Sequence, residues 1–306
     1  MSLAFVFPGQ GSQSVGMMAA YGEAAPIRDT FVEASDVLGF DLLKMVTEGP
    51  IEALNQTINT QPAMLAAGVA VYRFWLAQGG AVPALMAGHS LGEYTALTCA
   101  GSLDFTDALK LVRLRAEAMQ SAVPDGAGAM AAVLGLDDAT IRAVCAEAAQ
   151  GEVLEAVNYN SPGQVVIAGN KAAVDRGCVL AKEKGAKRAL QLPVSVPSHC
   201  ALMKPAAEKL LAAMHDIHIS APIIPVIHNA DVMTHDDPEA IRAALARQLH
   251  SPVRWVESMQ ALAARGVLRI AECGPGKVLA GLNKRILDNV PTLALADAAS
   301  IAAARQ

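Results

Sequence analysis

Residues 87–97, AGHSLGEYTAL, place Ser90 between Gly88 and Gly92 at a point where a strand becomes a helix. The residues before it, 81–88, form an apolar run, and those after it follow helical spacing. A serine with a glycine two residues to either side, between a strand and a helix, matches the G-x-S-x-G pattern of a nucleophile elbow. Only glycine fits beside the serine in so tight a turn, and the hydroxyl is then exposed at the helix N-terminus.

Two interpretations of Ser90 remain open at this point. It is either an acyl-accepting nucleophile, with free N–H groups and the helix dipole able to hold an oxyanion, or an ordinary helix-capping serine. The motif alone does not decide between them, so a base has to be found elsewhere in the chain.

The composition excludes several classes of protein. The 306 residues are 53% hydrophobic, enough for one large domain or two moderate ones around a sizeable core. A net charge of −5 argues against nucleic-acid and membrane-surface partners, and an aromatic content of 4% argues against base stacking. The N-terminus has no cleavage signature, and the apolar run 63–72 is well short of the roughly 18 residues that a span needs. We therefore expect a cytoplasmic protein.

Neither a metal nor a cofactor is expected. The five cysteines form no C-x-x-C pair and read as reduced core residues, and His215 and His218 have no further ligand at a recognisable spacing. The glycine-rich segment 5–16 has Ser14 where the dinucleotide fingerprint needs glycine. The segment CGPGKVL has Val278 where a phosphate loop needs serine or threonine.

Strands and helices alternate in the first and last parts of the chain, which predicts a parallel sheet covered on both faces. Strands are expected at 3–7, 81–88, 223–227 and 267–271, and helices at 29–38, 62–78, 105–122, 201–214, 238–249, 254–265 and 276–288. The alanine-rich segment 296–306 is expected to be peripheral.

Residues 126–194 follow a different order, β-α-β-β-α-β, which is the ferredoxin-like pattern. Asp137 or Asp138 is expected to cap the first of its helices, and the turn 161–163 to join its two middle strands. The last strand is expected at 187–196. The predicted division is a catalytic core of 1–125 and 196–306 with a small subdomain of 126–195.

Among the histidines, His199 is the best candidate for the base, because it follows a strand and directly precedes a helical pattern, at the rim where the elbow lies. Standing alone, a histidine there is more often structural or capping. His89 adjoins Ser90, but neighbouring side chains at a turn usually diverge. Cys200 suggests a thiol nucleophile, although the adjacent His199 is poorly placed to activate it.

The helix at 105–122 carries a second clue, because Arg115 falls within its apolar sector while Arg113 falls on the polar side. A guanidinium on a buried face must be paired. Its partner is either an internal carboxylate or a substrate carboxylate held by the two parallel hydrogen bonds that arginine offers and lysine does not.

Seven motifs follow one another over residues 3–287: FVFPGQGSQ, GHSLGEY, VRLRAEAM, NYNSPGQVVIAG, VSVPSHC, RQLHSPVRW and ECGPGKVLAGL. In this order they resemble the malonyl-CoA:acyl-carrier-protein transacylases, stand-alone enzymes of bacterial type II fatty-acid synthesis. The resemblance implies an α/β fold, with an α/β-hydrolase-like parallel sheet core and an inserted ferredoxin-like subdomain.

The same resemblance assigns roles to residues that match the motifs. It implies Ser90 as nucleophile, His199 as base, Gln248 as the residue orienting His199, Gln10 and the N–H of Leu91 as oxyanion hole, Arg115 as carboxylate binder, and Asn160 and Ser198 as candidate pocket residues. No acidic third member beside the base is expected.

The activity implied is transfer of malonyl from malonyl-CoA to the phosphopantetheine thiol of acyl carrier protein through a malonyl-serine intermediate. Two alternatives stay open: an acyltransferase for another acyl-CoA such as methylmalonyl-CoA, and a serine thioesterase or hydrolase. The cluster Lys182, Lys184, Lys187 and Arg188 is either a dock for an acidic carrier or a solvated helix end. The sequence leaves the oligomeric state open, with a monomer as the simplest expectation.

Overall fold

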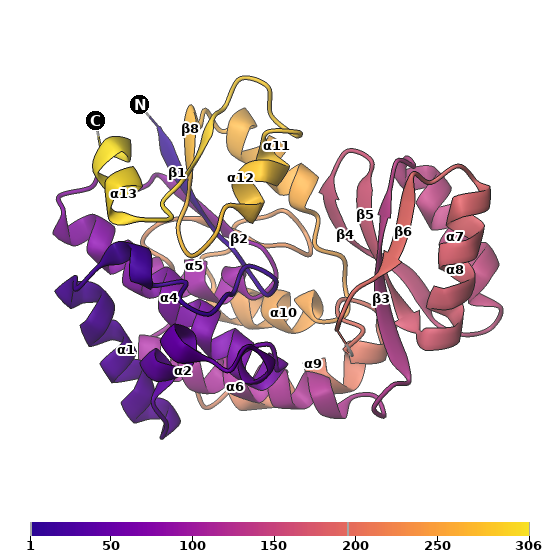
Figure 1. Cartoon of the computed structure of the whole chain (residues 1–306), viewed down its shortest axis with the longest axis horizontal. Helices are drawn as coiled ribbons and strands as arrows, with labels where there is room; N and C mark the ends of the chain where they lie inside the picture. The colour runs from indigo at the N-terminus through magenta and orange to yellow at the C-terminus, as the bar shows by residue number, and fades with distance from the viewer. Residues whose placement is uncertain (1, 195, 306) are drawn as a thin grey trace.

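The computed structural model describes residues 2–194 and 196–305 and contains two separate sheets (Figure 1). The larger sheet has five strands in the order β7-β2-β1-β8-β9, and every neighbouring pair is parallel. Its strands are β1 (Leu3–Phe7), β2 (Leu85–Gly88), β7 (Val226–Ile227), β8 (Arg269–Glu272) and β9 (Thr292–Ala294). The predicted parallel sheet is confirmed, and the carboxyl ends of its strands share one edge, where α/β proteins bind ligands.

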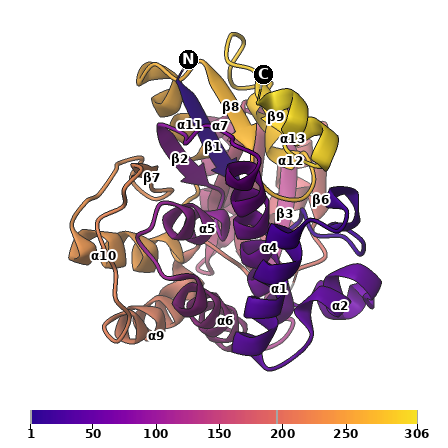
Figure 2. The same cartoon turned by 90° about the vertical axis from the view of Figure 1, so that its left-hand side faces the viewer.

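Helices cover both faces of this sheet (Figures 1 and 2). Phe5, Phe7 and Met86 pack into the main core on one face, and Val6 and Ala87 into a second cluster on the other. The main-core face carries α1 (Ala25–Leu38), α2 (Leu42–Glu48), α3 (Ile51–Leu54), α4 (Thr57–Ala77), α5 (Gly92–Cys99), α6 (Phe105–Ser121), α9 (Lys204–Met214) and α10 (Pro238–Gln248), and the other carries α11 (Trp255–Ala264) and α12 (Val278–Asn283). Because both faces are covered, every residue of β1 and β2 is buried.

The central helix α4 begins at Thr57, so the expectation of a start at Pro62 is wrong. Proline is usual in a first helical turn, but here it lies inside the helix and costs one backbone hydrogen bond. Continuous burial from Thr60 to Tyr72 offsets that loss. The earlier start also brings Gln61 into the helix, which matters for the site below.

The C-terminal part departs from expectation in two places. The helix expected at 276–288 is shorter, Val278–Asn283, and is followed by β9, which the sequence did not indicate because a three-residue strand shows no clear alternation. The alanine-rich end forms α13 (Ala298–Ala304), whose Ile301 side chain is buried in the main core. This end therefore closes one side of the core.

The smaller sheet is antiparallel, in the order β4-β5-β3-β6, with α7 and α8 on its outer face (Figure 1). Its elements are β3 (Gly128–Leu134), α7 (Asp138–Ala149), β4 (Leu154–Ser161), β5 (Gln164–Asn170), α8 (Lys171–Glu183) and β6 (Arg188–Gln191). The predicted β-α-β-β-α-β order is confirmed, and Asp137 caps α7 by accepting from Thr140 N at 2.8 Å. β6 ends earlier than expected, and Ser195 of the expected strand lies outside the described residues.

Main-chain hydrogen bonds at Val253 fix the small sheet to the segment before α11. Tyr159 N donates to Val253 O at 3.0 Å, and Val253 N donates to Val157 O at 2.8 Å. β4 is thereby fixed against the segment that leads into α11, so the inner face of the small sheet is held over the edge of the large one. The division into a catalytic core of 1–125 and 196–306 and a small subdomain of 126–195 stays a prediction.

Candidate active site

Ser90 lies on a sharp turn between β2 and α5, with a positive φ of 52°. A Cβ on Gly88 would lie 1.9 Å from Gly92 C, and one on Gly92 would lie 2.0 Å from Phe7 O. Both glycines are therefore required by close backbone approach, as the spacing in the sequence predicts. A non-glycine residue with φ above zero is strained, and strain of this kind is common at active sites.

His199 meets Ser90 across the turn. The Ser90 hydroxyl donates to His199 Nε2 over an Oγ–Nε2 distance of 2.7 Å, and His199 Nδ1 lies 2.7 Å from the main-chain oxygen of Gln248. Because a carbonyl only accepts, Nδ1 carries the proton and Nε2 has its lone pair free for the serine proton. The pair has the geometry of a nucleophile and its general base.

The surroundings keep this histidine neutral. Burial first, and then the positive charge of Arg115, lower the pKa of His199 to about 3. A histidine with an ordinary pKa of 6.5 would be largely protonated in mild acid, whereas His199 stays able to accept a proton there.

We expect the rate of Ser90 acylation to change less than about twofold between pH 5 and pH 8, where a base of ordinary pKa would lose about 30-fold at the acid end. Rapid-quench labelling at constant ionic strength would measure this pH profile.

The lowered pKa of His199 also makes the free energy of unfolding fall as the pH drops below 6.5, because the unfolded state takes up the proton first. The folded fraction must therefore be followed by circular dichroism, and an acid limb near pH 6.5 in folded protein would contradict the assignment.

Arg115, on α6, extends its guanidinium into the same site and is almost fully buried. Nη1 donates to Gln61 Oε1 at 2.8 Å, and Nη2 donates to Gln248 Oε1 at 3.1 Å and to Ser90 Oγ at 3.3 Å. The group lies over the Tyr94 ring, 5.3 Å from its centroid. Among the described residues, Nε has no hydrogen-bond partner.

No carboxylate of the described residues lies within 4.0 Å of Arg115, so the internal ion pair that the sequence left open is not found. A buried cation that has only neutral amides and a hydroxyl as hydrogen-bond partners is costly. The arrangement favours an incoming anion beside Ser90, where the fork can bind it with two hydrogen bonds.

Gln248, at the C-terminal end of α10, connects the base to the arginine. Its main-chain oxygen accepts from His199, while its side-chain Nε2 donates to Ser90 O at 2.9 Å and to Glu93 Oε2 at 2.8 Å. Its side-chain oxygen accepts from Arg115. The main chain of Gln248 thus orients the base, and its side chain orients the arginine.

Behind Gln248 lies a buried group that the sequence did not single out. The Glu93 carboxylate accepts from His228 Nδ1 at 2.7 Å and from Asn229 N at 2.9 Å. Gln61 was likewise missed, because the expected helix began after it. Only Glu93 had a signal in the sequence, as the glutamate of GHSLGEY at the start of a helix that is otherwise apolar.

Gln10 and Leu91 line the same cavity as Ser90, and within the described part of the chain the main-chain N–H of neither residue has an acceptor. The Gln10 side chain donates to Thr57 Oγ1, another group on the cavity lining, at 3.3 Å. Because that side-chain amide is engaged with Thr57, the main-chain N–H is the free donor that Gln10 offers to an oxyanion. Gly9 allows the close approach, because a Cβ there would lie 2.5 Å from His89 O.

We expect Gly9→Ala to lower acylation of Ser90 by about 10²-fold, because the added methyl pushes the loop away and displaces the N–H of Gln10. Gly281→Ala is the matched control, since a Cβ there meets nothing within 4 Å. Single-turnover labelling of both variants measures the effect. Equal acylation rates in Gly9→Ala and Gly281→Ala would show that acylation of Ser90 does not depend on the position of this loop.

The cavity around Ser90 has a volume of about 130 Å³ and lies between the two sheets. Met130 and Val166 of the small sheet form one wall, and Ser198 lies on the lining as expected. Asn158 also lines it, with a buried Oδ1 that has no partner among the described residues. The Asn160 side chain instead accepts from His89 Nε2 at 2.8 Å and is not part of the lining.

The thiol of Cys200 is a poor nucleophile in this setting. It is buried, donates to Pro197 O at 3.1 Å, and has its pKa raised by burial to about 12. The alternative of a thiol nucleophile therefore has no support.

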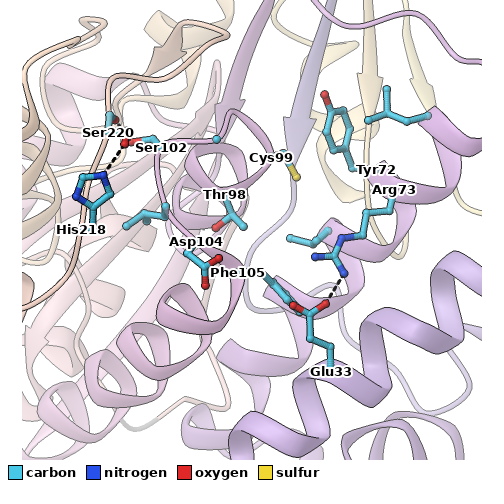
Figure 3. A pocket seen from close by; sticks show the side chains of 14 residues that line it. Glu33, Tyr72, Arg73, Thr98, Cys99, Ser102, Asp104, Phe105, His218 and Ser220 are labelled. Carbon is cyan, nitrogen blue, oxygen red and sulfur yellow. Dashed lines mark hydrogen bonds and ion pairs between the residues drawn. The ribbon is translucent and has the colours of Figure 1, made fainter.

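A second and larger cavity, about 490 Å³, lies near the start of α6 (Figure 3). Polar groups on its lining are engaged with one another: Arg73 pairs with Glu33 at 2.7 Å, and His218 Nε2 lies 3.0 Å from Ser220 Oγ. Dashed lines in Figure 3 mark both interactions. Burial raises the pKa of its Cys99 thiol, so no thiolate is available there. The smaller cavity at Ser90 remains the candidate active site.

Within residues 2–194 and 196–305, no three or more histidine, cysteine, aspartate or glutamate side chains form a group able to hold a metal ion. None of the helices in these residues has the length and apolar character needed to span a membrane.

A serine on a strained turn, a neutral histidine bonded to it, two free N–H groups and a buried arginine facing the serine define a serine-dependent acyl-transfer enzyme on an α/β scaffold. The family model described as "Acyl transferase domain" matches residues 4–302. The chain belongs to this acyl transferase family, and it is an acyltransferase.

Several proteins named malonyl CoA-acyl carrier protein transacylase are similar to this chain. The one from Escherichia coli K12 is 58% identical over 98% of both chains, and the one from Bacillus subtilis is 45% identical over 99% of this chain and 96% of its own. Solved structures include an acyl carrier protein S-malonyltransferase from Vibrio cholerae, with a TM-score of 0.97 and 57% identity over 99% of this chain and 100% of its own. Another is a malonyl-transacylase in complex with a type II PKS acyl-carrier protein, with a TM-score of 0.98 and 53% identity over 100% and 99%.

Proposed function

We infer that this protein transfers the malonyl group from malonyl-CoA to the phosphopantetheine thiol of acyl carrier protein, in fatty-acid synthesis. The names of its relatives, at up to 58% identity over nearly the whole chain, give the substrate and the acceptor. Within the site, the observation that carries the proposal is the Arg115 guanidinium, which faces Ser90 and has no carboxylate partner among the residues that the structure describes.

In the first half of the reaction, Ser90 Oγ attacks the thioester carbonyl and its proton passes to His199 Nε2. The carbonyl oxygen becomes an oxyanion, to which the N–H groups of Gln10 and Leu91 donate. When the carbon–sulfur bond breaks, His199 returns the proton to the leaving sulfur of coenzyme A. Malonyl then remains esterified to Ser90, with its carboxylate bound by Arg115.

In the second half, the carrier thiol attacks the ester carbonyl and gives its proton to His199. The same N–H groups bind the second oxyanion, and the carbon–oxygen bond to Ser90 breaks as His199 protonates the serine. Enzyme and His199 return to their starting state, so the cycle is ping-pong and needs no cofactor.

Two alternatives keep the serine chemistry. A hydrolase would use water in the second half, but an arginine directed at an anionic acyl group serves no purpose for a general esterase. An enzyme for methylmalonyl-CoA would use the same arginine, and the segment Val196–Ser198 before the base would then have to admit a methyl group. The malonyl assignment rests on the relatives as well as on the arginine.

The test is an intact-mass measurement with peptide mapping after mixing with malonyl-CoA alone. One malonyl on Ser90, discharged by adding acyl carrier protein, is the expected result. Steady release of free malonate without an adduct would favour a hydrolase. An adduct formed only from methylmalonyl-CoA would keep the mechanism and change the substrate.

We further propose a cytoplasmic location and a monomer as the working unit. Carrier docking at the basic cluster remains an alternative to a solvated helix end. One member, Lys184, already lies 3.7 Å from Glu147, which reduces the free positive charge of the cluster.

A further inference from the structure

Asn229, which follows β7 and is fully buried, holds the backbone of the nucleophile turn directly through its side chain. Its side-chain Nδ2 donates to Gly88 O at 2.7 Å, and its side-chain Oδ1 accepts from Ser90 N at 2.8 Å. One side-chain amide therefore forms hydrogen bonds with the main chain on both sides of His89. We propose that Asn229 is a positioning residue that fixes Ser90 for attack.

The register of β7 against β2 explains why this amide fits. The strands pair at Met86 with Val226 and at Ala87 with Ile227, and Met86 N donates to Pro225 O at 2.9 Å. If the parallel ladder continued, the main-chain N–H and C=O of residue 229 would pair with Gly88 O and Ser90 N. The Asn229 side chain makes both of those bonds, so it replaces a peptide unit of the ladder.

The main chain of Asn229 is engaged elsewhere, which makes this substitution necessary. Its N–H donates to Glu93 Oε2 at 2.9 Å, and its C=O accepts from Arg254 N at 3.2 Å. The strand has thus turned away from β2 at the point where β2 itself bends into the elbow. Without the side chain, Gly88 O and Ser90 N would be left without these partners inside the protein.

The consequence for Ser90 is control of a strained backbone. A residue at φ 52° is not held there by its own preference, so the surrounding structure must hold it. The two bonds from Asn229 fix the peptide groups that set the direction of the Ser90 side chain. Arg115 is held by Gln61 and Gln248 and makes no hydrogen bond to the Asn229 side chain, whose two bonds go to Gly88 O and Ser90 N.

Because different side chains hold Ser90 and Arg115, the test compares acyl groups with and without a carboxylate. We expect Asn229→Ala to slow labelling of Ser90 by about 10²-fold with malonyl-CoA, with acetyl-CoA and with a fluorophosphonate probe, at an unchanged malonyl-to-acetyl ratio. Asn283→Ala is the matched control, because Asn283 is also fully buried and its side chain makes two hydrogen bonds, with Trp255 and Thr292, away from the site. The Asn283→Ala protein should be less stable than the unaltered protein, while Ser90 in its folded fraction should be labelled at the normal rate.

Asn229→Asp adds a pH profile that a purely structural role would not give. At neutral pH the introduced carboxylate places an oxygen opposite Gly88 O. The hydrogen bond to Gly88 O is then lost, because a carboxylate oxygen cannot donate. In acid the carboxyl becomes protonated and its O–H can donate to Gly88 O again. Labelling should therefore recover by about tenfold between pH 8 and pH 5. The titratable groups around this position, Glu93, His228 and His199, are also present in the unaltered protein, whose profile is the reference.

Normal labelling of folded Asn229→Ala, or a loss no larger than its unfolded fraction, would overturn the proposal. A loss confined to malonyl would also overturn it, because Asn229 would then act through Arg115. The proposal for Asn229 rests on the proposed function only in its choice of malonyl as the acyl group. Failure of malonyl-CoA to label the unaltered protein would refute that function, while the fluorophosphonate probe would still decide the role of Asn229.

Discussion

Replacement of Ser90 by alanine is expected to lower malonyl transfer by about 10⁴-fold or more and to abolish the covalent adduct, because no other group takes its place. The Oγ atom is bonded to His199 Nε2 at 2.7 Å, and the neighbouring Cys200 thiol is held protonated by burial. The measurement is transfer of radiolabelled malonyl to acyl carrier protein, together with the intact mass of the enzyme.

The control is Ser102→Ala, a buried serine that donates to Ser220 O at 2.7 Å and does not line the cavity at Ser90. It removes one hydrogen bond from the fold and should leave transfer within about twofold for folded protein. A malonyl adduct on Ser90→Ala would move the nucleophile to another residue and refute the mechanism.

Arg115→Lys is expected to reduce malonyl transfer by about 10²–10³-fold, because an ammonium can neither bind a carboxylate with two parallel hydrogen bonds nor replace the contacts to Gln61 and Gln248. Transfer of acetyl, which has no carboxylate, should fall far less. The ratio of kcat/KM for malonyl-CoA and acetyl-CoA is therefore the decisive measurement.

Arg113→Lys is the matched control on the same helix, since Arg113 is half-exposed and pairs with Glu117 at 3.3 Å. It should leave both substrates unaffected. Near-normal malonyl turnover in Arg115→Lys would refute the carboxylate role, and equal losses for malonyl and acetyl would make Arg115 a general support of Ser90.

The features that follow from local spacing were predictable from the sequence. Gly88 and Gly92 mark the elbow because only glycine tolerates the backbone approach, and the helical phase puts Arg115 on the buried side. The order of strands and helices in 126–194 gives the small sheet without any long-range information.

The contacts between distant segments were not predictable from the residues alone. Ser90 and His199 are 109 positions apart, and Ser90 and Asn229 are 139 positions apart. Whether such side chains meet depends on how the loops after β6 and β7 end, and no periodicity encodes that. Asn229 carries no signal at all, since an asparagine after a two-residue strand reads as an ordinary turn residue.

The neutral carbonyl behind His199 has a consequence for the kind of acyl group that the enzyme can carry. In a triad with a carboxylate, a negative charge would lie on the far side of the imidazole, and a second negative charge on the acyl chain would be repelled by it. Here the main-chain oxygen of Gln248 orients the ring without adding charge. No carboxylate is hydrogen-bonded to the base to oppose the positive potential of Arg115 at Ser90, and a dicarboxylic half-ester can be stored on the serine without electrostatic repulsion from the direct hydrogen-bond partner of the base.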